Sequence, residues 1–259
     1  MGKRIDLNTD MGESFGTYTF GADEKLLKHI TTANIACGFH AGDPNVMDQT
    51  VQLAKKYNVA IGAHPGFPDV AGFGRRMIEF TPDEIYRLVA YQIGGLQAFC
   101  RIHGVKMQHV KPHGALYNLA ARNREVADAI AKAVKDIDPS FILFGPAGSE
   151  LLEAGKRSGL QVAAEVFADR TYQPDGSLTS RFEKDSMIED VDIAAAQIEQ
   201  IIKNGVVKAV NGELVAVEAD TVCVHGDGPH AVGFVKKLRE MLDNAGVEVV
   251  ALSKQESPE

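Results

Sequence analysis

Short runs of β-branched and apolar residues alternate with longer helical stretches along almost the whole chain, and this alternation constrains the fold most strongly. We predict strands at 4–8, 32–36, 59–63, 108–111, 141–144, 161–166, 221–224 and 247–252. Strands separated by helices imply a parallel sheet with helices outside it, because each crossover returns the chain to the same edge. For 259 residues, we favour a single α/β domain over 1–252, an irregular (β/α) barrel of about seven parallel strands. A doubly wound open sheet is the alternative, and 253–259 are expected to form a polar tail.

Local signals place the helices and loops between these strands. Helices are predicted to begin at Asp43-Pro44 and at Thr81-Pro82, because a capping side chain followed by proline is typical of a helix start. A hairpin is predicted across Asn211-Gly212, a dipeptide that favours a type I′ turn. The segments 65–80 and 168–188 read as long loops, which in compact domains often form lids or binding loops.

Composition excludes several classes of function. The chain has 27 Lys and Arg against 35 Asp and Glu, a formal charge of −8, which disfavours nucleic-acid binding. No apolar run approaches the roughly 20 residues that span a bilayer, and the first residues do not resemble a signal peptide. The three cysteines have no CxxC spacing, which is expected of a protein in a reducing cytoplasm. Cys37 and Cys223 are the candidate thiols, and we expect both to be buried as small hydrophobic residues.

Residues able to do chemistry follow the predicted strands at their carboxyl ends. They are Asp10, Glu13, Asn34, His40, His64, Lys111, His113, Glu165, Asp169, Arg170, His225 and Asp227. Active sites of α/β folds assemble at this end of the strands. A single histidine after a strand is most often a turn residue, but many ionisable residues after successive strands favour an active site.

The residue types indicate roles at such a site. Asp10 and Glu13 can divide acid–base work, with Asp10 as the base, unless Asp10 only caps a turn and Glu13 is solvated. Lys111 is expected to contact a phosphate or carboxylate of the substrate, and His113 to donate a proton, because its ordinary pKa is about 6.5. The alternative is that Lys111 to Gly114 is only a turn, with Lys111 in solvent. Asn34, His40, His64, Glu165, Asp169, Arg170, His225 and Asp227 are the expected substrate-binding residues.

A divalent metal is a further cofactor that the pattern leaves open. Its ligands would be Asp10, His64, His113 and His225, although neither HExxH nor paired CxxC motifs support the site. Nucleotide motifs are absent as well. The segment 148–156 has the wrong spacing for a phosphate-binding loop, and no GxGxxG follows a strand.

Seven blocks of sequence, in order, resemble the LamB/YcsF family. They are 6–16 (DLNTDMGESFG), 33–44 (ANIACGFHAGDP), 61–69 (IGAHPGFPD), 72–76 (GFGRR), 110–118 (VKPHGALYN), 165–172 (EVFADRTY) and 224–227 (VHGD). The resemblance runs from near the first residue to about Leu252, so it is highly specific. It implies an irregular (β/α) barrel related to glycoside hydrolase and deacetylase barrels.

The resemblance also implies an activity, which is ATP-dependent hydrolysis of 5-oxo-L-proline to L-glutamate. ATP is then a co-substrate, and two partner subunits, PxpB and PxpC, are implied. Two other hypotheses remain open at this point. One is a metal-dependent deacetylase or amidohydrolase of the same barrel class, and the other is a non-catalytic regulatory or scaffold subunit. Metal analysis tests the first, and inactivation of single site residues tests the second.

Overall fold

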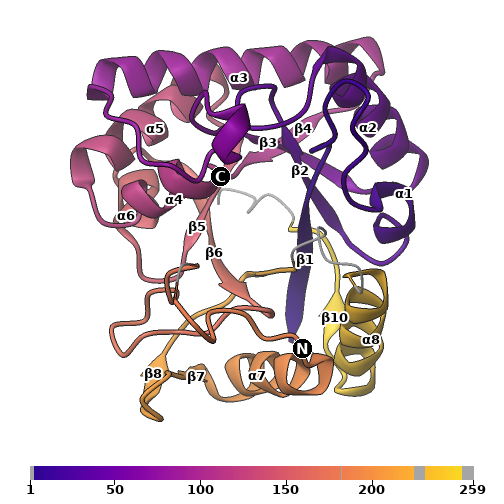
Figure 1. Cartoon of the computed structure of the whole chain (residues 1–259), viewed down its shortest axis with the longest axis vertical. Coiled ribbons are helices and arrows are strands. Elements are labelled where there is room, and N and C mark those ends of the chain that lie inside the picture. Colours follow the sequence, from indigo (N-terminus) through magenta and orange to yellow (C-terminus); the bar gives the residue numbers. More distant parts are fainter. Residues whose placement is uncertain (1–2, 182, 225–230, 253–259) are drawn as a thin grey trace, which may run out of the picture.

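Seven parallel strands close into a barrel in the computed structural model, which describes residues 3–181, 183–224 and 231–252 (Figure 1). In order around the barrel they are β1 (Arg4–Met11), β2 (Thr32–Ala36), β3 (Ala60–His64), β4 (Met107–Val110), β5 (Ile142–Pro146), β6 (Gln161–Phe167) and β9 (Thr221–Cys223). The barrel closes because β9 pairs with both β6 and β1. The predicted barrel is therefore confirmed, and the open doubly wound sheet is excluded. The expected tail at 253–259 lies outside the described residues.

Helices cover the outside of the barrel (Figure 1). The longer ones are α2 (Pro44–Lys56), α3 (Pro82–Ile102), α5 (Arg124–Ile137), α6 (Glu150–Arg157), α7 (Val191–Asn204) and α8 (Ala231–Asn244). Shorter turns are α1 (Asp23–Leu26), α4 (Gly114–Ala120) and the 3-10 turn η1 (Val70–Gly72). The start of α3 agrees with the sequence signal, since Thr81 and Glu84 form a reciprocal capping box. In the described part of the chain, no helix is both long enough and apolar enough to cross a membrane.

Two strands differ most in length from the prediction. β1 continues beyond the predicted end at Asn8 to Met11, because Asp10 and Met11 still pair with Asn34 and Ile35 of β2. The last strand, β10 (Glu248–Val249), has only two residues and pairs with the start of β1, outside the barrel. The predicted hairpin is present as β7 (Val206–Lys208) and β8 (Leu214–Ala216). The longer β1 is the more consequential difference, because it carries Asp10 inside the sheet.

Much of the interior of the barrel is polar, beside a small apolar cluster of Ile142, Phe144 and Ala163. Along β1, the side chains of Leu7 and Met11 join the hydrophobic core, while Asp6, Asn8 and Asp10 take the alternate positions. Asp6 is fully buried and accepts hydrogen bonds from the hydroxyl groups of three threonines, which are Thr31, Thr32 and Thr221. A buried polar group is stable only when it is hydrogen-bonded, so the barrel interior is a connected polar network. That network continues to the carboxyl ends of the strands.

Candidate active site

Lys111 lies at the centre of the polar network. It follows β4, and its ammonium Nζ is 3.0 Å from Oδ1 of Asp10 and 2.9 Å from Oε1 of Glu165. The same Nζ lies 3.2 Å from Sγ of Cys223 and over the ring of Phe167. The barrel thus brings strands β1, β6 and β9 to one cation, as the positions at strand ends predict.

The groups that surround Lys111 keep its side chain positively charged. Burial lowers the pKa of Lys111, but its interactions with Asp10, Cys223 and Glu165 together outweigh burial and raise the pKa well above its ordinary value. Lys111 is therefore an ammonium ion near neutral pH. It was expected to meet an anion of the substrate, whereas the structure neutralises it with two carboxylates of the protein itself. The alternative of a turn lysine in solvent is wrong, because Lys111 is 2% exposed.

Asp10 is held by three neighbours at the mouth of the barrel. Its Oδ1 accepts from Lys111 and from Nδ2 of Asn34, 2.9 Å away, and its Oδ2 is 3.3 Å from Nε2 of His64. Two donors on one oxygen favour the ionised carboxylate. About a tenth of the Asp10 side chain is exposed, so it can still meet a substrate. This arrangement suits a general base.

Glu165 is the deeper of the two carboxylates. It receives a hydrogen bond from Nδ2 of Asn8 at 3.0 Å and another from the hydroxyl of Tyr117. Burial and the charge of Glu165 raise the pKa of Tyr117 well above its ordinary value, so the phenol stays protonated and donates. The side chain of Glu165 is fully buried and bonded at both oxygens, so Glu165 holds Lys111 in place. It was expected to bind substrate, but it is not exposed to do so.

Three imidazoles gather beside Asp10, at the ends of β2, β3 and β4. The rings of His40 and His113 are stacked with centroids 3.7 Å apart, and His64 meets both rings edge-on. Nδ1 of His64 contacts the carbonyl of Lys111 at 2.7 Å, and Nε2 of His113 contacts the carbonyl of Phe73 at 2.8 Å. The fourth member is Glu13, whose Oε1 lies 3.5 Å from Nε2 of His40 and 4.0 Å from Nδ1 of His113.

The role of proton donor expected for His113 does not fit these contacts. Burial lowers the pKa of His113 well below its ordinary value, and the neighbouring imidazoles lower it further. One ring nitrogen is bonded to the Phe73 carbonyl, and the other faces His64 at 2.9 Å. A buried neutral imidazole with both nitrogens engaged is a poor source of protons.

Glycines make room for the imidazoles. A Cβ added at Gly66 would lie 2.7 Å from Nδ1 of His40, and one added at Gly74 would lie 2.7 Å from Cβ of His40 and 2.9 Å from Cδ2 of His113. Gly74 also has a φ of +63°, in the left-handed region that side chains disfavour. The two glycines therefore fix how closely the 65–80 loop approaches the rings.

The remaining expected residues fall into two groups. Arg170 and Asp169 are buried, but the Arg170 guanidinium donates to the backbone carbonyls of Ser186 and Thr179, so it fastens the 168–188 loop. Burial lowers the pKa of Arg170 to about 10. His225 and Asp227 lie outside the described residues. The expected metal set of Asp10, His64, His113 and His225 is thus represented by its first three members.

Several site residues were not predicted. Asn8 bonds both Glu165 and Thr221, and Tyr117 bonds Glu165, yet neither residue type stands out in a search for ionisable groups. Period-two alternation from Asp6 to Asp10 was the available signal for Asn8. The predicted thiols are buried as expected. Burial raises the pKa of Cys37 to about 12 and that of Cys223 well above its ordinary value, so neither is a nucleophile near neutral pH.

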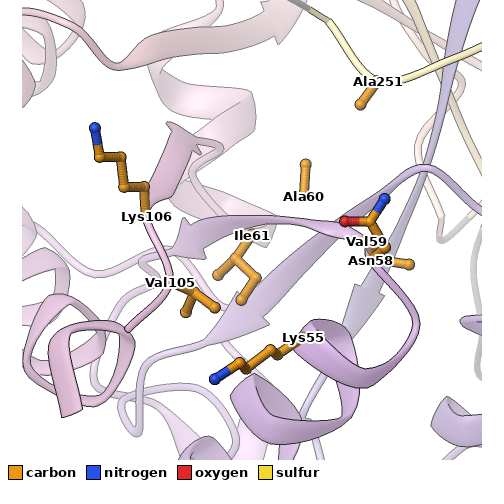
Figure 2. Close-up of a pocket in the computed structure, with 8 residues that line it drawn as sticks. All are labelled: Lys55, Asn58, Val59, Ala60, Ile61, Val105, Lys106 and Ala251. Atoms are coloured by element: carbon orange, nitrogen blue, oxygen red, sulfur yellow. The ribbon is translucent and has the colours of Figure 1, made fainter. Parts of the chain in front are cut away.

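A cavity of about 380 Å³ lies at the other end of the barrel (Figure 2). Ala60 and Ile61 at the start of β3, and Val105 and Lys106 just before β4, are among its lining residues. Among the described residues, its lining has two lysines but neither a carboxylate nor an imidazole. It therefore lacks the acid–base groups that gather at the carboxyl ends.

The fold and these contacts define a closed α/β-barrel protein with a buried ionic and imidazole site at the carboxyl ends of its strands. The chain belongs to the LamB/YcsF family, whose family model matches residues 5–257. It is similar to the A subunit of 5-oxoprolinase from Bacillus licheniformis, with 58% identity over 250 residues that cover 96% of this chain and 99% of that protein. The Bacillus subtilis protein of the same name is 57% identical over 254 residues, covering 98% and 99%.

Two solved structures place the fold. The lactam utilization protein of Thermus thermophilus superposes with a TM-score of 0.91 at 45% identity, covering 96% of this chain and 100% of that one. The catalytic domain of a peptidoglycan N-acetylglucosamine deacetylase from Eubacterium rectale has a TM-score of 0.50 at 12% identity, covering 98% and 90%. The second likeness concerns the barrel alone. The expected family and barrel class are both confirmed.

Proposed function

We propose that this chain is the A subunit of an ATP-dependent 5-oxoprolinase, which hydrolyses the lactam of 5-oxo-L-proline to L-glutamate while ATP is converted to ADP and phosphate. The observation that carries this proposal is the 55–58% identity, over nearly the full chain, to relatives named as the A subunit of 5-oxoprolinase. The similarity to a lactam utilization protein supports the same substrate class.

The chemistry of a lactam explains why ATP is consumed. A five-membered lactam is an unactivated amide whose ring closure is favourable, so plain hydrolysis is a poor forward reaction. Transfer of the terminal phosphoryl group of ATP to the lactam oxygen turns that oxygen into a good leaving group. Water then attacks the ring carbon and loses a proton to a base, and the ring C–N bond breaks as the nitrogen takes up a proton, which leaves an acyl phosphate. A second water hydrolyses the acyl phosphate to the carboxylate and free phosphate.

The described residues supply part of this chemistry. Asp10 is the proposed base, because its carboxyl group is held by two donors and is partly exposed at the barrel mouth. Lys111 and Asn34 orient Asp10 and hold its charge, so they are positioning residues. A base fixed by two neighbours needs little reorganisation when the proton arrives.

The chain is proposed to act with partner subunits. The sequence lacks both common phosphate-binding motifs, while the implied reaction consumes ATP. We assign nucleotide binding and phosphoryl transfer to PxpB and PxpC, consistent with the word "subunit" in the names of the relatives. Because the reaction uses ATP and the three cysteines are free, we place the complex in the cytoplasm.

An assay of glutamate release tests the proposal. 5-Oxo-L-proline and ATP are supplied to this chain alone, to PxpB and PxpC without it, and to the reconstituted mixture. We expect glutamate and ADP in equal amounts only from the mixture. ATP-dependent glutamate formation by the isolated chain would contradict the assignment of nucleotide binding to the partners. Glutamate from the isolated chain without ATP would instead favour an amidohydrolase.

A further inference from the structure

We propose that Glu13, His40, His64 and His113 form a binding site for one divalent transition-metal ion. These residues follow or end the four consecutive strands β1 to β4, and one ligand atom of each lies within 4.8 Å of the others. The inference concerns metal binding itself and does not depend on the proposed lactam hydrolysis.

The strongest observation is the contact between His64 and His113. Nδ1 of His64 faces the Lys111 carbonyl, and Nε2 of His113 faces the Phe73 carbonyl. A carbonyl oxygen only accepts hydrogen bonds, so each of these nitrogens carries the ring proton. In neutral rings the opposite nitrogens then present lone pairs, and those two nitrogens face each other at 2.9 Å. Two lone pairs at that distance repel unless a proton or a metal ion lies between them.

A metal ion bound by both nitrogens accounts for this geometry. Two nitrogens bound to one ion at about 2.1 Å are about 3.0 Å apart at an angle near 90° and about 3.4 Å apart at a tetrahedral angle. The backbone carbonyls behind the two rings are also the partners that metal-binding histidines commonly have.

His40 supplies a second, independent observation. Its side chain is fully buried, and neither ring nitrogen has a hydrogen-bond partner in the described part of the chain. An imidazole buried without a partner is costly. Its Nε2 lies 3.5 Å from Oε1 of Glu13, a separation that two ligands of one ion can have. A metal ion in the cluster would satisfy this nitrogen.

The donor set selects the class of ion. Three imidazoles and one carboxylate suit zinc, iron, cobalt or manganese, whereas magnesium and calcium prefer oxygen ligands throughout. Asp10, with Oδ2 3.3 Å from Nε2 of His64, adds a second negative charge beside the cluster. Such an ion, when bound, supplies Lewis-acid chemistry next to the proposed base. Glu13 and His113 then serve as ligands in place of the acid–base roles expected from the sequence.

Cobalt titration of the chelator-treated, untagged chain tests the site. We expect one Co²⁺ per chain by elemental analysis, visible absorption bands of the bound ion, and no displacement by excess Mg²⁺. Binding should raise the melting temperature, because an ion that binds only the folded state stabilises it. Failure of the wild-type chain to bind Co²⁺, Zn²⁺ or Mn²⁺ stoichiometrically would overturn the proposal, whatever the variants do.

Variants locate the ion. His40→Asn and Glu13→Gln are each expected to weaken Co²⁺ binding about tenfold or more, while circular dichroism shows a folded barrel. The matched control is His29→Asn, a partly exposed histidine between α1 and β2, which should bind as the wild type does. Equal binding by all three variants would assign the ion to the protein surface and overturn the proposal.

Discussion

Nζ of Lys111 lies 2.9 Å from Oε1 of Glu165, and neither side chain has more than 3% of its surface exposed. The pair joins the end of β4 to β6 across the polar interior of the barrel. Asp10 contacts the same ammonium from β1, so one cation holds two buried carboxylates. Lys111 is therefore a structural requirement of the site, and its loss should affect folding as well as catalysis.

Lys111→Met is expected to lower the free energy of unfolding by about 3–5 kcal/mol, because it leaves buried carboxylates without their counter-charge. Glutamate formation in the assembled complex should be abolished, since Asp10 loses the donor that orients it. Denaturant unfolding followed by circular dichroism measures the first effect.

A second substitution tests whether the stability lost in Lys111→Met comes from unpaired charges or from lost packing. Lys111→Met combined with Glu165→Gln should recover part of the lost stability, because one of the two unpaired charges is gone. Lys156→Met, which removes an exposed lysine paired with Glu153 on α6, should leave stability unchanged. If Lys111→Met is as stable as the wild type, the ion pairs of Lys111 do not hold the barrel interior.

The sequence predicted the strands and the end of the barrel where the site lies. Alternation of apolar and helical segments is a local property, and parallel strands bring their carboxyl ends together whatever the loops do. For this reason Asp10, His64 and Lys111 meet as expected. The same local reasoning found the start of α3, where Thr81 and Glu84 are only three residues apart.

The pairing of side chains could not be predicted in the same way. Whether Lys111 meets a substrate or Glu165 depends on the register of β4 against β5 and of β5 against β6, which no local pattern encodes. Likewise, Arg170 follows a strand but turns into its own loop to bond Ser186 and Thr179. The close approach of His40 to His113 depends on Gly74, which lies 34 positions after His40 and 39 positions before His113.

Asp10→Asn in the assembled complex is expected to reduce turnover about a hundredfold or more, the usual contribution of general acid–base catalysis. Asparagine keeps the shape and can still accept from Asn34 and Lys111, but it cannot take a proton. Steady-state glutamate release at saturating substrate measures the effect. Asp128→Asn on the exposed side of α5 is the control. Near-normal turnover of Asp10→Asn would show that Asp10 is not the base.

Asp6→Asn is expected to stabilise the protein at neutral pH. Burial raises the pKa of Asp6, although the three threonine hydroxyls oppose the shift. A carboxyl whose pKa is higher in the folded state binds more protons there, so its contribution to stability falls as pH rises from the unfolded value through the folded one. Asparagine keeps an oxygen for Thr31 and Thr32 and removes this charge.

Melting temperatures of the wild type and Asp6→Asn should therefore differ at pH 7 and converge in acid, below the unfolded pKa of about 3.9. Asp136→Asn is the control, because the pKa of Asp136 is shifted in the opposite direction to that of Asp6. Lys132 and Tyr86 lower the pKa of Asp136, so that variant should show no gain at pH 7. A melting difference for Asp6→Asn that is constant with pH would show that folding does not raise the pKa of Asp6.

Gly74→Ala is expected to abolish glutamate formation and weaken cobalt binding while the barrel stays folded. Its Cβ would lie 2.7 Å from Cβ of His40 and 2.9 Å from Cδ2 of His113, so the rings must move. Gly104→Ala is the matched control, because Gly104 has a φ of +66° against +63° for Gly74, yet a Cβ there meets no atom within 4 Å. Both variants should lose about 1–2 kcal/mol of stability from the left-handed backbone. Only Gly74→Ala should lose function, and equal activity of the two variants would show that the ring positions of His40 and His113 do not matter to the reaction.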